Sequence, residues 1–244
     1  MVKRLVNGYA IQPGVYLPAL ILPNENLKGV DLSGAILTGA TLTGTNLKGA
    51  NLSGANLAGS YLPGADLPGA NLKGVDLSGA DLHVANLTGA KLTGAYLFDA
   101  DLYNAEMTGA DLTSAYLEGA KLTGAYLRDV NLSGADLSGA NLSSTNLISA
   151  NLTGAILTGA ILRRADLTLA KLEGANLADA NLKCADLSGV NLISANLAGA
   201  NLTGADLTGA NLFDADLTNA DLSGAIVHGT DFTGTIFSDA KGLP

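Results

Sequence analysis

Large apolar residues recur with a period of five along almost the whole chain. From Leu17 to Phe237 every fifth residue is large and apolar: 41 of these 45 positions are Leu, and the others are Met107, Val227, Phe232 and Phe237. The residue two positions earlier is Ala in 33 of the 45 units, and the residue between them is mostly Asp or Asn. Each unit typically closes with Ser or Thr followed by Gly.

A five-residue period fits neither a helix nor a long strand. In an α-helix a step of five turns about 500°, which scatters the leucines over several faces. In a flat strand an odd step sends successive leucines to opposite faces. Within one unit, however, Ala and Leu are two residues apart and share one face of a short extended segment. A turn in the same direction after every unit brings all these faces to one axis, which predicts a β-solenoid.

Local preferences agree with short segments between tight turns. Ala, Asn, Asp and Gly are poor residues for long strands, whereas Ser, Thr and Gly suit turns. Coils stacked about 4.8 Å apart would pair their backbones in parallel ladders and keep the Leu and Ala columns dry. The period alone leaves open whether each coil has three or four sides.

The A-(D/N)-L-x-x units resemble the pentapeptide-repeat family over roughly residues 15–240. The resemblance implies an all-β fold, a right-handed quadrilateral parallel β-helix of about eleven coils with one pentapeptide on each side. Val30, Val130 and Val190, which replace Ala, are separated by multiples of 20 and agree with four sides. We therefore expect an N-terminal cap (1–14), one β-helix (15–240) and a C-terminal tail (241–244).

Both ends of such a rod expose strand edges and apolar columns, so each end needs cover. We expect Tyr9, Ile11 and Pro13 to form the N-terminal lid, and the rings of Phe232 and Phe237 to fill the other mouth. Glu25 is a charged residue at an Ala position. It predicts a loosened first coil or contact with water.

Composition narrows the class of protein further. The net charge of −9 disfavours direct binding to nucleic acid and suits basic protein partners. No apolar run reaches about 18 residues, so no membrane span is expected. Cys184 is the only cysteine and cannot form an internal disulfide, which makes the cytoplasm the expected compartment.

The sequence offers no catalytic, metal-binding or cofactor-binding pattern. His83 and His228 are 145 residues apart, which in the expected rod is roughly 35 Å along the axis. Cys184 is also several coils from His83, so the two cannot act as a nucleophile and its base. The spacing of metal ligands is absent, and no Gly-Lys-Ser/Thr completes a phosphate loop.

Departures from the repeat concentrate after residue 90 and suggest a partner surface, because exposed Tyr and Arg are typical of recognition sites. With four units per coil, Tyr96 and Tyr116 would stack on one side. The alternative is neutral drift at solvent-facing positions. The candidate residues are Lys91, Tyr96, Phe98, Tyr103, Tyr116, Lys121, Tyr126 and Arg128.

These features predict a non-enzymatic protein-binding or scaffolding rod whose protein partner the sequence does not identify. The alternative, implied by the family resemblance, is a DNA-mimicking modulator of a type II topoisomerase (gyrase). Because both ends carry covering residues, which oppose end-to-end growth, we expect a monomer or weak dimer.

Overall fold

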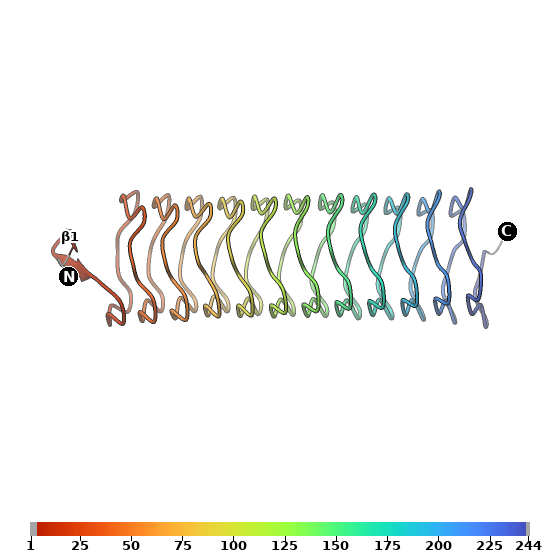
Figure 1. The fold of residues 1–244 in the computed structure, drawn as a ribbon, viewed down its shortest axis with the longest axis horizontal. Coiled ribbons are helices and arrows are strands. Elements are labelled where there is room, and N and C mark those ends of the chain that lie inside the picture. The colour runs from red at the N-terminus through yellow and green to blue at the C-terminus, as the bar shows by residue number, and fades with distance from the viewer. Residues whose placement is uncertain (1–3, 243–244) are drawn as a thin grey trace.

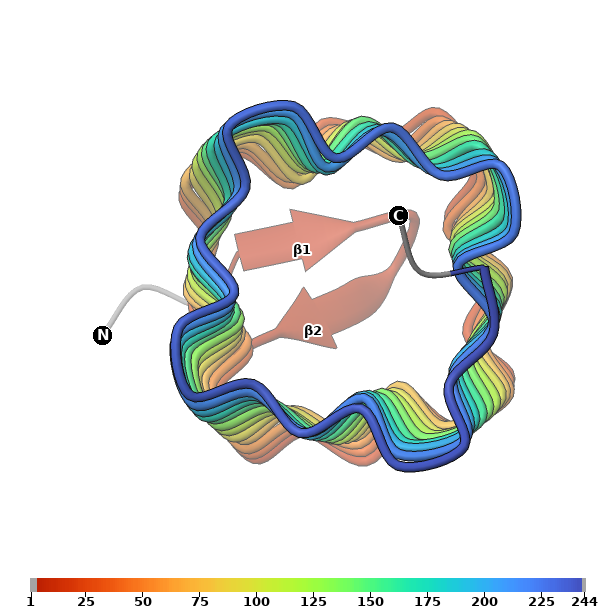
Figure 2. The ribbon, with the colours of Figure 1, turned by 90° about the vertical axis from the view of Figure 1, so that its right-hand side faces the viewer.

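The chain folds into one straight rod. The computed structural model describes residues 4–242 and shows coils stacked along a single axis, with the chain ends at opposite ends of the rod (Figure 1). Seen along that axis, each coil is a square (Figure 2). All coils turn in the same sense, and the β-helix is right-handed.

Each coil consists of four units, one on each side. Asp111 pairs with Asn131 and Asn131 with Asn151 in parallel bridges, and the same step from one coil to the next runs from Tyr16 to Lys241. This step gives about eleven coils, and it confirms the predicted fold class. We number the sides in chain order, so that residues 120–124, 125–129, 130–134 and 135–139 form sides 1 to 4 of one coil.

Of every five successive N–H groups, four donate to main-chain oxygens, as residues 131–135 illustrate. Asn131 N–H donates to Ala110 O at 2.9 Å in the preceding coil, and Leu132 N–H donates to Asn151 O at 2.7 Å in the next. Gly134 N–H donates to Thr153 O at 3.0 Å. The N–H of Ala135 closes the turn on Leu132 O, also at 3.0 Å.

The fifth N–H explains why Asp or Asn precedes each Leu. The N–H of Ser133 donates to Asn131 Oδ1 at 3.2 Å, two residues back. Such a contact is an Asx turn, for which the short Asp and Asn side chains with an acceptor oxygen are well suited. In several units a hydroxyl adds a second donor, as in Ser138 Oγ to Asp136 Oδ1 at 2.6 Å.

The last position of each unit has a left-handed backbone, which is why it is usually Gly. Gly134, for example, has φ +63°. The same conformation at Val84, with φ +52°, is unusual because a β-branched side chain crowds the backbone there.

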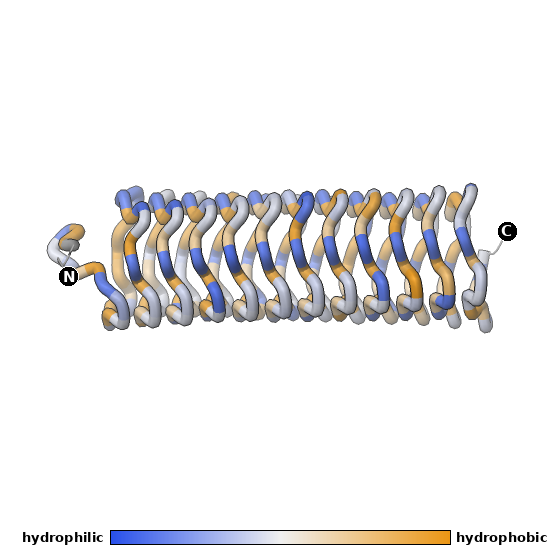
Figure 3. Tube along the Cα trace, in the orientation of Figure 1, coloured by the Kyte–Doolittle hydropathy of each residue, from blue (hydrophilic) through white to orange (hydrophobic). Residues whose placement is uncertain are grey.

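The core consists of the Leu and Ala columns. Leu132 and Ala135 are 1% and 0% exposed, and the pattern continues from Leu20 to Leu222. Figure 3 shows apolar and polar segments alternating along the coils. Because each Leu lies one coil from the next Leu of its column, the coils depend on their neighbours for burial.

Three polar residues replace Ala inside this core. Thr45 Oγ1 donates to Leu22 O at 2.6 Å, and Thr145 Oγ1 donates to Leu142 O at 2.7 Å. Ser60 is 1% exposed, and its hydroxyl has no hydrogen-bond partner among the described residues.

A β-hairpin lies at the N-terminal end. Strands β1 (Arg4–Val6) and β2 (Tyr9–Ile11) are antiparallel, and Figure 2 shows them across the mouth of the rod. Ile11 is 5% exposed and belongs to the core, as the lid prediction requires. Tyr9 belongs to the same strand as Ile11 and is exposed, as is Pro13. Residues 1–3 of the predicted cap lie outside the described residues.

The Glu25 carboxylate accepts a hydrogen bond from the N-terminal hairpin. Asn7 Nδ2 donates to Glu25 Oε1 at 2.7 Å, which gives the half-buried carboxylate a protein partner. At the other end, Phe232 and Phe237 point inward and meet edge to face, with ring centroids 5.4 Å apart. Residues 243 and 244 of the predicted tail lie outside the described residues.

Leu132→Lys should lower the free energy of unfolding by at least about 3 kcal/mol, because it places an unpaired charge in a dry core. Urea denaturation measures this change. The matched control is Ser133→Lys, one residue on at a turn position, which should cost less than about 0.5 kcal/mol. Equal losses for the two variants would contradict the inward assignment.

Ser60→Ala should raise the free energy of unfolding by about 1 kcal/mol, because it removes a buried hydroxyl that has no partner. Ala40 and Ala80 already occupy the same position in the adjacent coils. Thr45→Val is the matched control: it also removes one buried hydroxyl, but that hydroxyl is hydrogen-bonded, so stability should fall. A loss of stability in both variants would show that the Ser60 hydroxyl has a partner.

Candidate partner-binding surface

The eight residues selected from the sequence do not form one surface. Successive units lie on successive sides, so a run of less than two coils is distributed around the whole rod. The structure places Tyr96, Phe98 and Tyr116 on side 4, Tyr103 and Lys121 on side 1, Tyr126 and Arg128 on side 2, and Lys91 on side 3. The largest group on one side is Tyr96, Phe98 and Tyr116 on side 4.

Three of the rings on side 4 form a cluster. Tyr96 and Tyr116 stack one coil apart, with ring centroids separated by 5.1 Å and planes inclined by 5°. Phe98 lies beside both, at 6.0 Å from Tyr96 and 5.8 Å from Tyr116. The two tyrosines are 42% and 41% exposed, and Tyr126 on side 2 is 52% exposed, which confirms that these side chains point outward. The predicted stacking on one side is confirmed.

Acidic residues border this aromatic cluster. Glu118 follows Tyr116 in the same unit, and its Oε2 atom is buried without a hydrogen-bond partner among the described residues. Asp136 lies one coil further along side 4, and the Asp99 carboxylate lies over Gly119. No ion pair between described residues neutralises these groups. The cluster therefore combines three rings with three carboxylates.

The environment of Glu118 favours its protonated form. Burial is the first cause that raises the pKa of this carboxyl, and it outweighs the contact with its own main chain, which lowers the pKa. The charge of Asp136 and a hydrogen bond with Asp136 raise it further. Two carboxylates face each other here with no cation between them.

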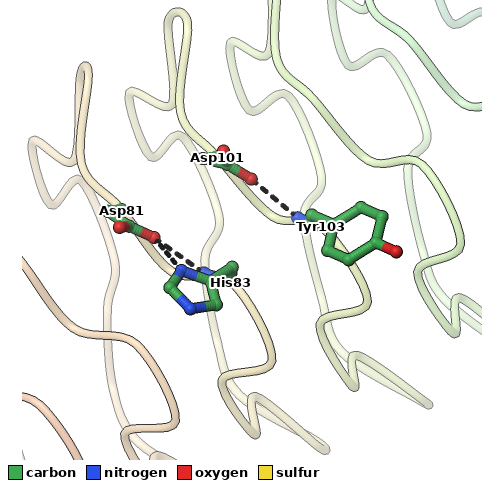
Figure 4. Close-up of polar contacts among 4 residues, drawn as sticks. All are labelled: Asp81, His83, Asp101 and Tyr103. Atoms are coloured by element: carbon green, nitrogen blue, oxygen red, sulfur yellow. Dashed lines mark hydrogen bonds and ion pairs between the residues drawn. The ribbon is translucent and has the colours of Figure 1, made fainter.

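Side 1 carries a second set of contacts, shown in Figure 4. His83 Nδ1 lies 2.6 Å from Asp81 Oδ1, which also accepts the His83 N–H at 3.1 Å. One coil further, Asp101 Oδ1 accepts the N–H of Tyr103 at 3.0 Å, and the Tyr103 ring points outward (Figure 4). The Asp81–His83 pair is thus the usual Asx turn of a unit, in which the imidazole makes a second contact with the same carboxylate oxygen. Figure 4 shows no third side chain in contact with this pair.

Carboxylates also line up on side 2. Asp166, Asp186 and Asp206 occupy successive coils. Each accepts donors from its own turn, and the hydroxyl and N–H of Thr208 lower the pKa of Asp206. Within residues 4–242 no three His, Cys, Asp or Glu residues are grouped so that they could hold a metal ion.

Sequence reasoning identified the rings but not the acids beside them. Glu118 occupies an ordinary turn position, and Asp136 follows the consensus, so neither gives a signal in the sequence. The available clue is the sequence separation of Glu118 and Asp136. In a coil of four units it brings the turn position of one coil beside the outward-pointing position of the next coil. The five-residue period alone does not give the number of sides, so this clue depends on the four sides that the family resemblance implied.

Taken together, fold and surface define a right-handed quadrilateral β-solenoid with an aromatic and acidic surface on one side. The family model for pentapeptide repeats (eight copies) matches the chain in overlapping segments that cover residues 20–239. The chain therefore belongs to the pentapeptide-repeat family.

Solved structures of pentapeptide-repeat proteins resemble the chain over most or part of its length. HetL, involved in heterocyst differentiation regulation in the cyanobacterium Nostoc sp. strain PCC 7120, is 37% identical, with 93% of this chain and 90% of that chain covered and a TM-score of 0.37. QnrB1, a plasmid-mediated fluoroquinolone resistance protein, is 20% identical, with 90% and 92% covered and a TM-score of 0.42. A thylakoid lumen protein of Arabidopsis thaliana is 36% identical, with 44% and 68% covered and a TM-score of 0.21.

Two further comparisons bear on the chain. A search of curated protein sequences gives no match. Among the described residues, no helix has the length and apolar character that crossing a membrane requires.

Glu118→Gln should raise the melting temperature by a few degrees at pH 7 and by less at pH 4. A raised pKa means that the folded state favours the protonated acid, so the wild type loses stability as pH rises from the ordinary carboxyl range through the raised pKa. Gln does not titrate and is spared this loss. Thermal unfolding at both pH values measures the difference.

Glu106→Gln is the matched control, because the Glu106 carboxylate already accepts hydrogen bonds from the N–H and hydroxyl of Thr108. It should not gain stability at pH 7. A gain for Glu118→Gln that is the same at pH 4 and pH 7 would show that the carboxylate charge is not the cause.

Proposed function

We propose that the protein is a non-enzymatic scaffold that binds a protein partner through side 4, with the neighbouring part of side 1 as a secondary contact. The stacked rings of Tyr96 and Tyr116 with Phe98 beside them are the observation that carries this proposal. Most outward positions on the rod hold small polar residues, so three rings in contact form an unusual apolar surface. Tyr side chains are frequent at the energetic centres of interfaces.

The partner presents a positively charged side chain to this surface. An Arg or Lys placed against the rings would gain cation–π contacts, and the negative charges of Glu118 and Asp136 beside the rings would attract it. Burial and the charge of Asp136 make the Glu118 carboxylate costly, so a cation bound near both acids gains affinity from reducing that cost. The net charge of −9 also favours basic partners.

The cytoplasm suits this function, because the exposed thiol of Cys184 stays reduced there.

The DNA-mimicking modulator of a type II topoisomerase is the second candidate. The column of Asp166, Asp186 and Asp206 on side 2 favours it, since regularly spaced carboxylates resemble the phosphates of a duplex. The two candidates use different sides of the rod and can be separated by substitution.

A quantitative pull-down from the source cytosol, with wild type and the double variant Tyr96→Asn/Tyr116→Asn as baits, tests the leading proposal. Asn is a usual residue at both positions, so the fold should be retained. Loss of a central Tyr costs about 2 kcal/mol or more in typical interfaces, so the partner should bind at least about tenfold more weakly. Glu118→Gln, which removes the carboxylate charge, should weaken the same partner.

Tyr126→Asn is the matched control, because it removes an equally exposed Tyr from side 2. Partner binding should not change in this variant. If the double variant and the wild type recover the same proteins at the same levels, side 4 is not the binding surface. Recovery of a type II topoisomerase that depends on Asp186 and Asp206, and not on the tyrosines, would favour the second candidate.

A further inference from the structure

A basic groove lies on side 1, some distance along the rod from the aromatic cluster. Ser143, Ser144, Arg163 and Arg164 line a depression of about 250 Å³. Lys183 occupies the position of Arg163 in the following coil. The chain has only 13 Lys and Arg residues against 22 acids, so three cations in two adjacent turns are a marked local concentration.

Within residues 4–242 these cations have no ion-pair partner. Neither of the two ion pairs found among the described residues involves Arg163, Arg164 or Lys183. The nearest acids of side 2 are directed elsewhere: Asp166 accepts donors from Thr168, and Asp186 accepts donors from Ser188. Like charges in adjacent turns repel one another, and a bound anion reduces that repulsion.

The backbone orients the cations toward one place. Side chains at the left-handed turn position lean over the next coil, as Cys184 Sγ does at 3.5 Å from the site of a Cβ on Gly204. Arg164 has the same conformation, with φ +56°, so its side chain is directed toward the turn that holds Lys183. A non-Gly residue such as Arg in this region carries backbone strain.

A main-chain donor is also free at the groove. In the adjacent coils the corresponding N–H groups, those of Ser143 and Lys183, donate outward to Asn141 Oδ1 and Asn181 Oδ1. Ile161 replaces the Asn in the coil between them, so the N–H of Arg163 has no such acceptor. It points to the same outer surface as the guanidinium groups.

We propose that this groove binds a phosphoryl group, free or esterified. Two guanidinium forks match the oxygens of a phosphate, which carries nearly two negative charges at neutral pH. The Lys183 ammonium adds a point charge, while the Arg163 N–H and the Ser144 hydroxyl supply neutral donors. The site lies apart from the aromatic cluster and does not depend on the function proposed above.

Titration with inorganic phosphate, followed through the arginine Nε–Hε signals by NMR at constant ionic strength, tests the proposal. We expect saturable shifts of the Arg163 and Arg164 signals. Phosphoserine and glycerol 3-phosphate, titrated in the same way, distinguish the source: tighter binding of an ester assigns the site to an esterified phosphate, and tighter binding of inorganic phosphate assigns it to the free ion.

The variant Arg163→Gln/Arg164→Gly should weaken binding by at least about tenfold, because it removes both guanidinium groups. It restores the usual Gly at the strained turn, so folding is not impaired. Lys91→Asn/Lys171→Asn is the matched control, since it removes two charges from side 3 and should change affinity by less than about twofold.

Equal weakening in both double variants would show that phosphate responds only to net charge and would overturn the proposal. So would shifts that do not saturate, or equal shifts with chloride.

Discussion

The whole rod depends on the main-chain hydrogen bonds between coils and on the one N–H in each unit that these bonds leave out. Four N–H groups of a unit pair with backbone oxygens in the same or adjacent coils. The fifth, represented by Ser133, has only the side chain two residues earlier as an acceptor. The Asp or Asn of the repeat is therefore a structural requirement of the backbone, and the apolar columns can form because no N–H needs an acceptor in the core.

This constraint gives meaning to departures from the repeat. Tyr96 and Tyr116 replace the acceptor side chain on side 4, and Ile161 replaces it on side 1, so each gives up a hydrogen bond that its unit normally has. The cost of one such bond at the surface is modest, about 1 kcal/mol, and can be offset by a gain elsewhere. On side 4 part of this cost is offset by the stacking of the Tyr96 and Tyr116 rings.

The two proposed surfaces show how a solenoid separates functions. The aromatic cluster with Glu118 suits a cation, whereas the groove at Arg163 and Arg164 suits an anion. They lie on neighbouring sides, two to three coils apart, which is on the order of 10–15 Å along the axis. Because the rod is one continuous stack, the distance between them is fixed by sequence separation. An elongated partner could engage both surfaces at once, and opposite charges would determine its direction along the rod.

The sequence by itself determined the local structure. Leu132 points inward because the first and third residues of a unit share one face, whereas Asn131 between them points outward and accepts the turn N–H of Ser133. These orientations depend only on residues within the same unit, so every unit with the same sequence pattern has them. The five-residue period does not decide which units lie above one another: the family resemblance implied four sides, and only the tertiary structure shows the contacts that result. The turn angle sets four sides, and this brings Tyr96 to Tyr116 and Glu118 to Asp136 while it sends Tyr126 to another side. Contacts between adjacent coils depend on that angle, which no single unit of the repeat encodes.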